Sequence, residues 1–163
     1  MLPELLNEQL RLNNGTIVKK CPTVKPLYCA KDGRFFSVRN MQITDEGCIM
    51  HEVRPCFSPS QHNHNGGSAY PCMRNFANRS CHTLIWEAWV GPRTPGMEID
   101  HINGDKMNWS LDNLEEVTPA ENRKRAVLLR ELRRNGRDPK QMTRDELQAI
   151  FRKYRLVDPE TIE

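Results

Sequence analysis

Residues 97–122 constrain the fold of this chain more than any other part of its sequence. Residues 99–102 indicate a strand, and the Asn103-Gly104 pair that follows them is a strong turn signal. A second short strand is expected over residues 114–117. The run Thr118-Pro119-Ala120-Glu121 then provides an N-cap residue, a proline at the first helical position and an acid in the first turn. The segment therefore predicts strand, loop, strand and helix in that order.

The sequence before this segment has a different texture. Residues 16–79 contain short apolar or β-branched runs separated by turn residues, which predicts a β-meander. A short helix is expected over residues 5–12, and the polar, proline- and glycine-containing stretch 58–68 is expected to be a surface loop. Residues 81–90 carry apolar side chains at helical spacing, which predicts a helix that packs in a core.

Basic residues are concentrated in the C-terminal quarter of the chain. Residues 119–155 hold twelve Lys or Arg against five Asp or Glu, a net charge of +7 in a chain whose total is +3, so the remainder carries −4. This distribution is expected of a nucleic-acid binder, because neutralising phosphates with Lys and Arg releases condensed counterions. On charge alone, a solvated helical face explains it equally well.

The chain has neither a run of about 18 apolar residues nor the basic-then-apolar start of a secretion signal. We therefore expect a cytoplasmic protein, in a bacterium or a phage-infected host cell, that has no membrane partner. Cysteines in that compartment are reduced thiols or metal ligands. No Cys-x-x-Cys pair supports a structural zinc site. The cysteines can be small buried hydrophobic residues, and zinc binding stays the alternative because His62, His64 and His82 lie nearby in the sequence. The cysteines are Cys21, Cys29, Cys48, Cys56, Cys72 and Cys81.

Polar residues within 97–122 suit the hydrolysis of a phosphodiester, which requires a base for water and a cation for the developing charge. His101 suits the base, because an imidazole titrates near neutral pH. Asp100 supplies a hard oxygen ligand for Mg²⁺, and the Asn122 amide can add a second. Asn113 can accept a hydrogen bond from one imidazole nitrogen and leave the other for the proton. Asp100 and His101 are adjacent, so they face opposite sides of a strand unless that strand is distorted.

These residues also carry a family resemblance. The runs Asp100-His101-Ile-Asn-Gly-Asp105-Lys106-Met-Asn108, Asp112-Asn113-Leu114-Glu115 and Val117-Thr118-Pro-Ala-Glu121-Asn122 resemble the HNH nucleases of the ββα-metal class. The likeness is closest to phage and intron-encoded homing endonucleases, in which the third motif residue is Asn. By position, it implies that His101 is the general base, that Asn113 orients it, and that Asp100 and Asn122 bind one divalent metal.

The resemblance and the charge pattern together predict the division of the chain. The fold class is α+β, with an N-terminal β-meander, a ββα-metal hairpin and helix, and a basic helical C-terminus. Residues 1–80 are expected to hold the N-terminal helix and a β-rich module like those that bind DNA, residues 81–135 the nuclease core, and residues 136–163 a helical extension. The last two helices can form a helix-turn-helix reader or an arm that packs on the core.

We accordingly predict a DNA endonuclease that uses Mg²⁺, for which Mn²⁺ can substitute, and that acts on double-stranded DNA rather than on a small molecule. It is expected to be a monomer of phage or mobile-element origin, of the homing type. The alternatives are a DNA-binding protein that retains the scaffold without turnover and a zinc-stabilised interaction module. The residues expected to contact DNA are Lys106, Asn108, Arg123, Lys124 and Arg125.

Overall fold

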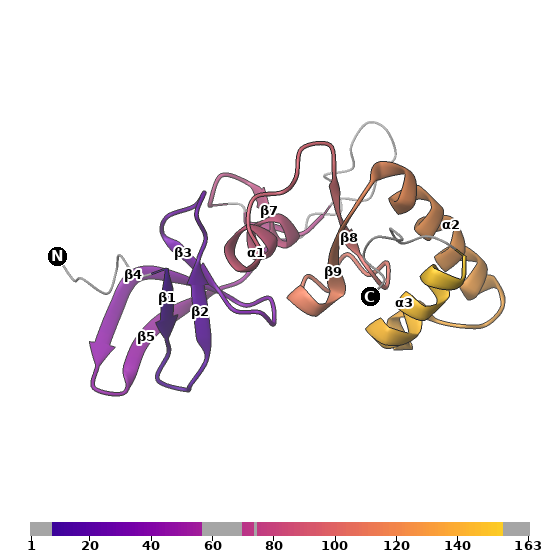
Figure 1. Ribbon diagram of the computed structural model, residues 1–163. Coiled ribbons are helices and arrows are strands. Elements are labelled where there is room, and N and C mark those ends of the chain that lie inside the picture. The colour runs from indigo at the N-terminus through magenta and orange to yellow at the C-terminus, as the bar shows by residue number, and fades with distance from the viewer. Residues whose placement is uncertain (1–7, 57–69, 74, 155–163) are drawn as a thin grey trace. The chain divides into compact units, whose positions relative to one another are not determined.

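The computed structural model describes residues 8–56, 70–73 and 75–154. The chain divides into two compact units, Met1–Pro92 with Trp109–Leu111, and Arg93–Asn108 with Asp112–Glu163 (Figure 1). Strands and helices are both present, which confirms the predicted α+β class. The helix expected over residues 81–90 belongs to the first unit and the C-terminal helix to the second, while the three-part division predicted from the sequence stays a prediction.

The first unit is built on an antiparallel sheet whose five strands follow one another in chain order, as a β-meander predicts. A core that includes Leu10, Val18, Tyr28 and Phe36 lies on this sheet. A single bridge between Leu12 and Cys48 links the first strand's end to the last strand. The strands are β1 (Gln9–Arg11), β2 (Ile17–Lys20), β3 (Leu27–Cys29), β4 (Phe35–Thr44) and β5 (Gly47–Val53).

The N-terminal helix predicted over residues 5–12 is wrong where the structure describes it, because residues 9–11 form β1. Leu10 and Leu12, 6% and 5% exposed, are two positions apart and therefore reach the same core from one face of the strand. Gly15, with φ of 87°, makes the turn into β2. Strand pairing and burial of both leucines outweigh the helical tendency of the isolated sequence.

The rest of the first unit contains a small two-stranded sheet, β6 (Cys72–Met73) and β7 (Arg79–Ser80), and the helix α1 (Cys81–Trp89). The helix predicted over residues 81–90 is thus confirmed, and Leu84 and Ile85 on its inner face are fully buried. The loop predicted over residues 58–68 lies outside the described residues, as do His62 and His64.

The second unit has the predicted order of strand, loop, strand and helix. Its strands β8 (Glu98–His101) and β9 (Leu114–Val117) pair antiparallel, and the helices α2 (Pro119–Arg134) and α3 (Arg144–Lys153) follow. Short 3₁₀ turns lie at Leu111–Asn113 and Pro139–Gln141. The Thr118 side chain caps α2 by accepting from the Glu121 N–H at 3.1 Å. A complete capping box begins α3.

The two long helices of the second unit pack against one another through a small apolar core (Figure 1). Leu129 and Leu132 from α2 meet Leu147 and Phe151 from α3, and Ile102 from the hairpin completes the cluster. The apolar side of α3 is therefore used for packing. Over residues 8–56, 70–73 and 75–154, no helix is long and apolar enough to cross a bilayer.

Candidate active site

Strand alternation in β8 separates the predicted site residues into two groups. Glu98 and Asp100 are half-buried, whereas Ile99 and His101 are buried, so the burial alternates along the strand. Asp100 lies opposite Glu115 on β9, and His101 lies opposite Leu114. Residues two apart share a face of a strand, so Glu98 and Asp100 lie on one face. His101 therefore lies on the opposite face of β8 from Asp100. The distortion that would turn the two side chains to one side is not present, because the β8–β9 pairing runs without a bulge from Glu98 to His101.

The loop that follows His101 is held by the amide of Asn113. The Asn113 Oδ1 accepts from the Asn103 N–H at 3.1 Å, and its Nδ2 donates to the Asn103 Oδ1 at 2.9 Å. The same Nδ2 donates to the backbone oxygen of Asn108 at 2.9 Å. Asn113 is only 8% exposed, so these bonds fix the loop from inside. The predicted role of Asn113 in orienting His101 stays a prediction.

Two side chains of α2 contact the other face of β8. The Asn122 Nδ2 donates to the Glu98 Oε2 at 2.6 Å. One turn later, the Arg125 Nη1 donates to the Asp100 Oδ2 at 3.2 Å and to the Glu115 Oε2 at 2.8 Å. Residues three apart on a helix are neighbours on its surface. The predicted metal residues Asp100 and Asn122 therefore both lie along the contact between β8 and the first turns of α2, where each is bonded to a different partner.

Arg125 does not lie where a contact with DNA phosphate requires it. Its side chain is 1% exposed, and its guanidinium lies 4.5 Å from the centre of the Phe151 ring. The carboxylates of Asp100 and Glu115 neutralise it inside the unit. The expectation for Arg125 is corrected accordingly: this cation belongs to the interior. The sequence contained the signal, because position 125 is in register with the buried Leu129 and Leu132.

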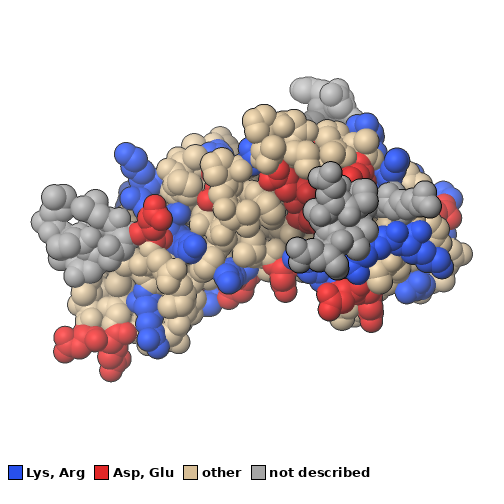
Figure 2. Space-filling view, in the orientation of Figure 1, with Lys and Arg blue, Asp and Glu red and all other residues tan. Residues whose placement is uncertain are grey.

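Arg123 and Lys124, by contrast, are exposed on α2, as a phosphate contact requires. Figure 2 shows Lys and Arg side chains gathered over the part of the chain that holds α2 and α3. Lys106 is half-buried, and burial lowers its pKa. Asn108 is also half-buried. The predicted contacts of these four residues with DNA stay predictions.

Burial shifts the pKa values of the two central ionisable groups. Burial raises the pKa of Asp100 to about 6, although the Arg125 guanidinium opposes this shift. Burial, together with the positive charge of Lys106, lowers the pKa of His101 to about 4. At neutral pH, Asp100 is therefore mostly ionised and His101 is neutral. An ionised carboxylate can bind a cation, and a neutral imidazole can accept a proton.

The donor set between β8 and α2 fits a hard divalent cation. Asp100 and Asn122 offer carboxylate and amide oxygens, which Mg²⁺ prefers. Asp100, Glu98 and Glu115 carry three carboxylates against the single guanidinium of Arg125, so the local charge favours a cation. Within the described part of the chain, no group of three or more His, Cys, Asp or Glu side chains is arranged to hold a metal. A cation here would therefore take its remaining ligands from water and phosphate.

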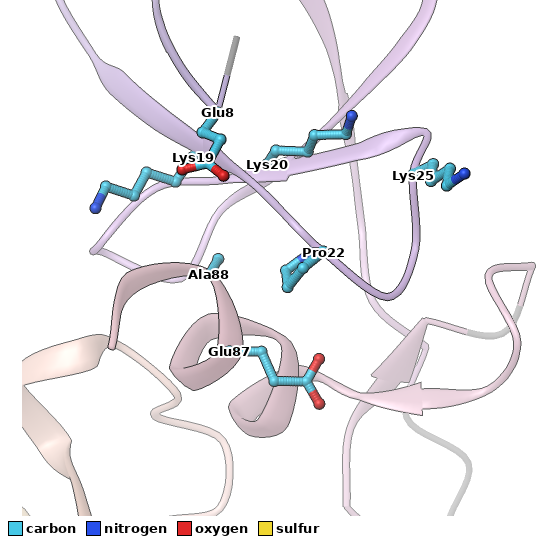
Figure 3. Close-up of a pocket in the computed structure, with 7 residues that line it drawn as sticks. All are labelled: Glu8, Lys19, Lys20, Pro22, Lys25, Glu87 and Ala88. Carbon is cyan, nitrogen blue, oxygen red and sulfur yellow. The ribbon is translucent and has the colours of Figure 1, made fainter. Parts of the chain in front are cut away.

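The cysteines and a solvent-accessible cavity lie apart from these residues in the sequence and belong to the first unit. Cys21, Cys29, Cys48, Cys72 and Cys81 are buried thiols, and Cys56 is exposed. The ring of His82 contacts that of Tyr70 at a tilt of 45°, with centroids 5.0 Å apart. A cavity of about 340 Å³ is lined by Glu8, Lys19, Lys20, Pro22, Lys25, Glu87 and Ala88. Figure 3 shows the Lys19 and Lys20 side chains extending in opposite directions, so they do not converge on one anion.

Comparison with known proteins places this hairpin and helix in a family context. Residues 79–124 match the HNH endonuclease family, which confirms the resemblance predicted from the motifs over that segment. Protein 3.8 of Escherichia phage T7 is 49% identical over 41 residues, which are 25% of this chain and 34% of the phage protein. The match thus spans about a third of the length of that relative. No solved structure matches the chain.

Proposed function

We propose that this protein is an endonuclease that hydrolyses phosphodiester bonds of double-stranded DNA with one divalent cation and His101 as general base. The observation that supports it most is that two oxygen-bearing side chains, Asp100 and Asn122, both lie along the contact between β8 and α2, within the segment that matches HNH endonucleases. Mg²⁺ bound there supplies positive charge for the phosphate and for the oxygen that leaves.

The chain's own groups divide the remaining work. His101, neutral at pH 7, accepts a proton from the attacking water. The loop that Asn113 fixes keeps the backbone after His101 in one conformation, which limits the positions open to the imidazole. The exposed Arg123 and Lys124 bind phosphates next to the site. The local match to a phage protein supports a phage or mobile-element origin. A homing role, and action as a monomer in the cytoplasm of the host cell, belong to the same proposal.

A supercoiled-plasmid assay with Mg²⁺ tests this proposal. The wild-type chain should nick or linearise the plasmid, EDTA should stop the reaction, and Mn²⁺ should restore it after the chelator is removed. His101→Ala should lower the rate by about a hundredfold or more while metal and DNA binding persist. Wild-type rates in the His101→Ala variant would contradict the assignment of the base.

One observation favours a second candidate, a DNA-binding protein without turnover. Asp100 and Asn122 already have protein partners in Arg125 and Glu98, and an ion pair with Arg125 competes with a cation for the Asp100 carboxylate. The same assay separates the two functions. A chain that shifts DNA on a gel but leaves plasmids intact with Mg²⁺ and with Mn²⁺ has the second function.

A further inference from the structure

An asparagine can serve as a metal ligand only if its amide is turned the right way. The carboxamide ends in one oxygen, which can bind a cation, and one NH₂ group, which cannot. Both orientations of the amide occupy almost the same volume. Whatever hydrogen-bonds to Asn122 therefore decides which of its two atoms a cation beside Asp100 would meet.

Glu98 makes this hydrogen bond. The Asn122 Nδ2 donates to the Glu98 Oε2 at 2.6 Å, and both side chains are partly buried. The Glu98 oxygen is the acceptor in this bond, so Glu98 engages the NH₂ end of the amide. The carbonyl oxygen of Asn122 is thereby left on the opposite side of the amide group.

Asp100 is held in a parallel way. Arg125 donates to one carboxylate oxygen of Asp100, the Oδ2, at 3.2 Å. Glu98 and Asp100 lie on the same face of β8, and their partners Asn122 and Arg125 lie one turn apart on α2. Two hydrogen bonds thus join the strand to the helix. They hold the Nδ2 of Asn122 and the Oδ2 of Asp100, so the Oδ1 of each proposed ligand is not the atom engaged in them.

We propose that Glu98 is a positioning residue, which turns the Asn122 amide so that its carbonyl oxygen faces a divalent cation bound with Asp100. The inference rests on the proposed function. It adds a residue that lies outside the motif made of Asp100, His101, Asn113 and Asn122. Glu98 acts through Asn122 and is not itself a ligand. Outer partners of this kind contribute about 10–100-fold to metal affinity.

A double-mutant cycle on the whole chain without DNA tests the proposal. Free Mn²⁺ is measured by electron paramagnetic resonance during titration of the wild type, Glu98→Ala, Asn122→Ala and the double variant. Each single substitution should weaken Mn²⁺ binding by about tenfold or more. The double variant should bind only slightly more weakly than Asn122→Ala alone, because Glu98 acts mainly through the amide it holds and adds otherwise only the attraction of its charge.

A matched control removes the same charge from the other face of the hairpin. Glu116 on β9 lies opposite Ile99, whereas Glu98 shares the face of Asp100. Glu116→Gln should change Mn²⁺ affinity by less than about twofold. Glu98→Gln should weaken it several-fold, because a glutamine can pair with either end of the Asn122 amide. This conservative variant keeps the side-chain volume, so it also serves if Glu98→Ala does not fold.

Defined outcomes overturn the inference. If Glu98→Ala weakens binding equally in the wild-type and Asn122→Ala backgrounds, Glu98 is an independent ligand or acts through charge alone. If Glu98→Gln binds Mn²⁺ like the wild type, the orientation of Asn122 does not depend on Glu98. Plasmid cleavage by the wild type tests the endonuclease proposal separately. If the effects of Glu98→Ala and Asn122→Ala on Mn²⁺ binding are non-additive but the wild type never cleaves DNA, only the catalytic proposal is refuted. A wild type that binds no Mn²⁺ refutes both.

Discussion

Replacing Arg125 by methionine should destabilise the second unit strongly. Methionine fills much of the same volume beside Phe151 but removes the cation from the carboxylates of Asp100 and Glu115. Their side chains are 11% and 27% exposed and Arg125 is 1% exposed, so water replaces the lost partner poorly. Removing one partner of a buried ion pair costs about 3–5 kcal/mol, which is a large fraction of the total stability of a small domain.

Urea denaturation followed by circular dichroism at 222 nm measures this loss, because α2 and α3 both belong to the second unit. Arg134→Met is the matched control, since the Arg134–Glu131 pair is 68% and 51% exposed and should contribute less than about 1 kcal/mol. In an Asp100→Asn, Glu115→Gln background, Arg125→Met should recover stability, because the Arg125 Nε and Nη2 have no hydrogen-bond partner among the described residues. Equal losses for Arg125→Met and Arg134→Met would refute this reasoning.

Three further predictions follow from individual contacts. Burial lowers the pKa of His101 from 6.5 to about 4, so the stability contributed by its neutral form is present above pH 6.5 and is lost as pH falls toward 4. Between pH 7 and 5, the metal-free wild type should therefore lose about 2 kcal/mol more unfolding free energy than His101→Gln. Parallel curves of unfolding free energy against pH for the two proteins would contradict this prediction. Gly33→Ala should lower the midpoint of thermal denaturation more than the matched Gly15→Ala. Both glycines have positive φ, but only an alanine at position 33 would place its Cβ 2.9 Å from the Trp109 indole. Equal decreases in the midpoint would rule out the steric contribution. Lys124→Ala should weaken DNA binding at 50 mM salt and reduce the slope of log K against log salt by about one; an unchanged slope would show that Lys124 does not contact phosphate.

The order of elements in the second unit could be predicted because the signals for it are local. Thr118 begins α2 as the sequence indicates, since an N-cap depends only on the next few residues, and the capping box that begins α3 at Thr143 is equally local. The hairpin was predictable for the same reason, from the turn at Asn103-Gly104 and the alternation around it. Residues 9–11 form a strand against the prediction because their partner, β2, is supplied by tertiary structure.

The parts of the candidate site that the sequence did not predict depend on contacts between elements. The helical register of Arg125 indicates an inward position, but its partners Asp100, Glu115 and Phe151 lie on other elements, so its ion pairs could not be predicted. Glu98 could not be predicted, because a lone glutamate two residues before an aspartate has no chemical pattern of its own. Its meaning appears only once α2 places Asn122 beside it.

The position of α3 has a consequence for efforts to shorten this protein. Phe151 lies against the guanidinium of Arg125, and the Gln148 Nε2 donates to the Glu115 Oε2 at 2.7 Å. A fragment trimmed to residues 79–124 would keep the whole family match but lose Arg125 itself, and one ending before Arg144 would leave Arg125 without the ring that covers it. The smallest fragment worth expressing is therefore defined by packing and extends to Lys153, well past the last motif residue.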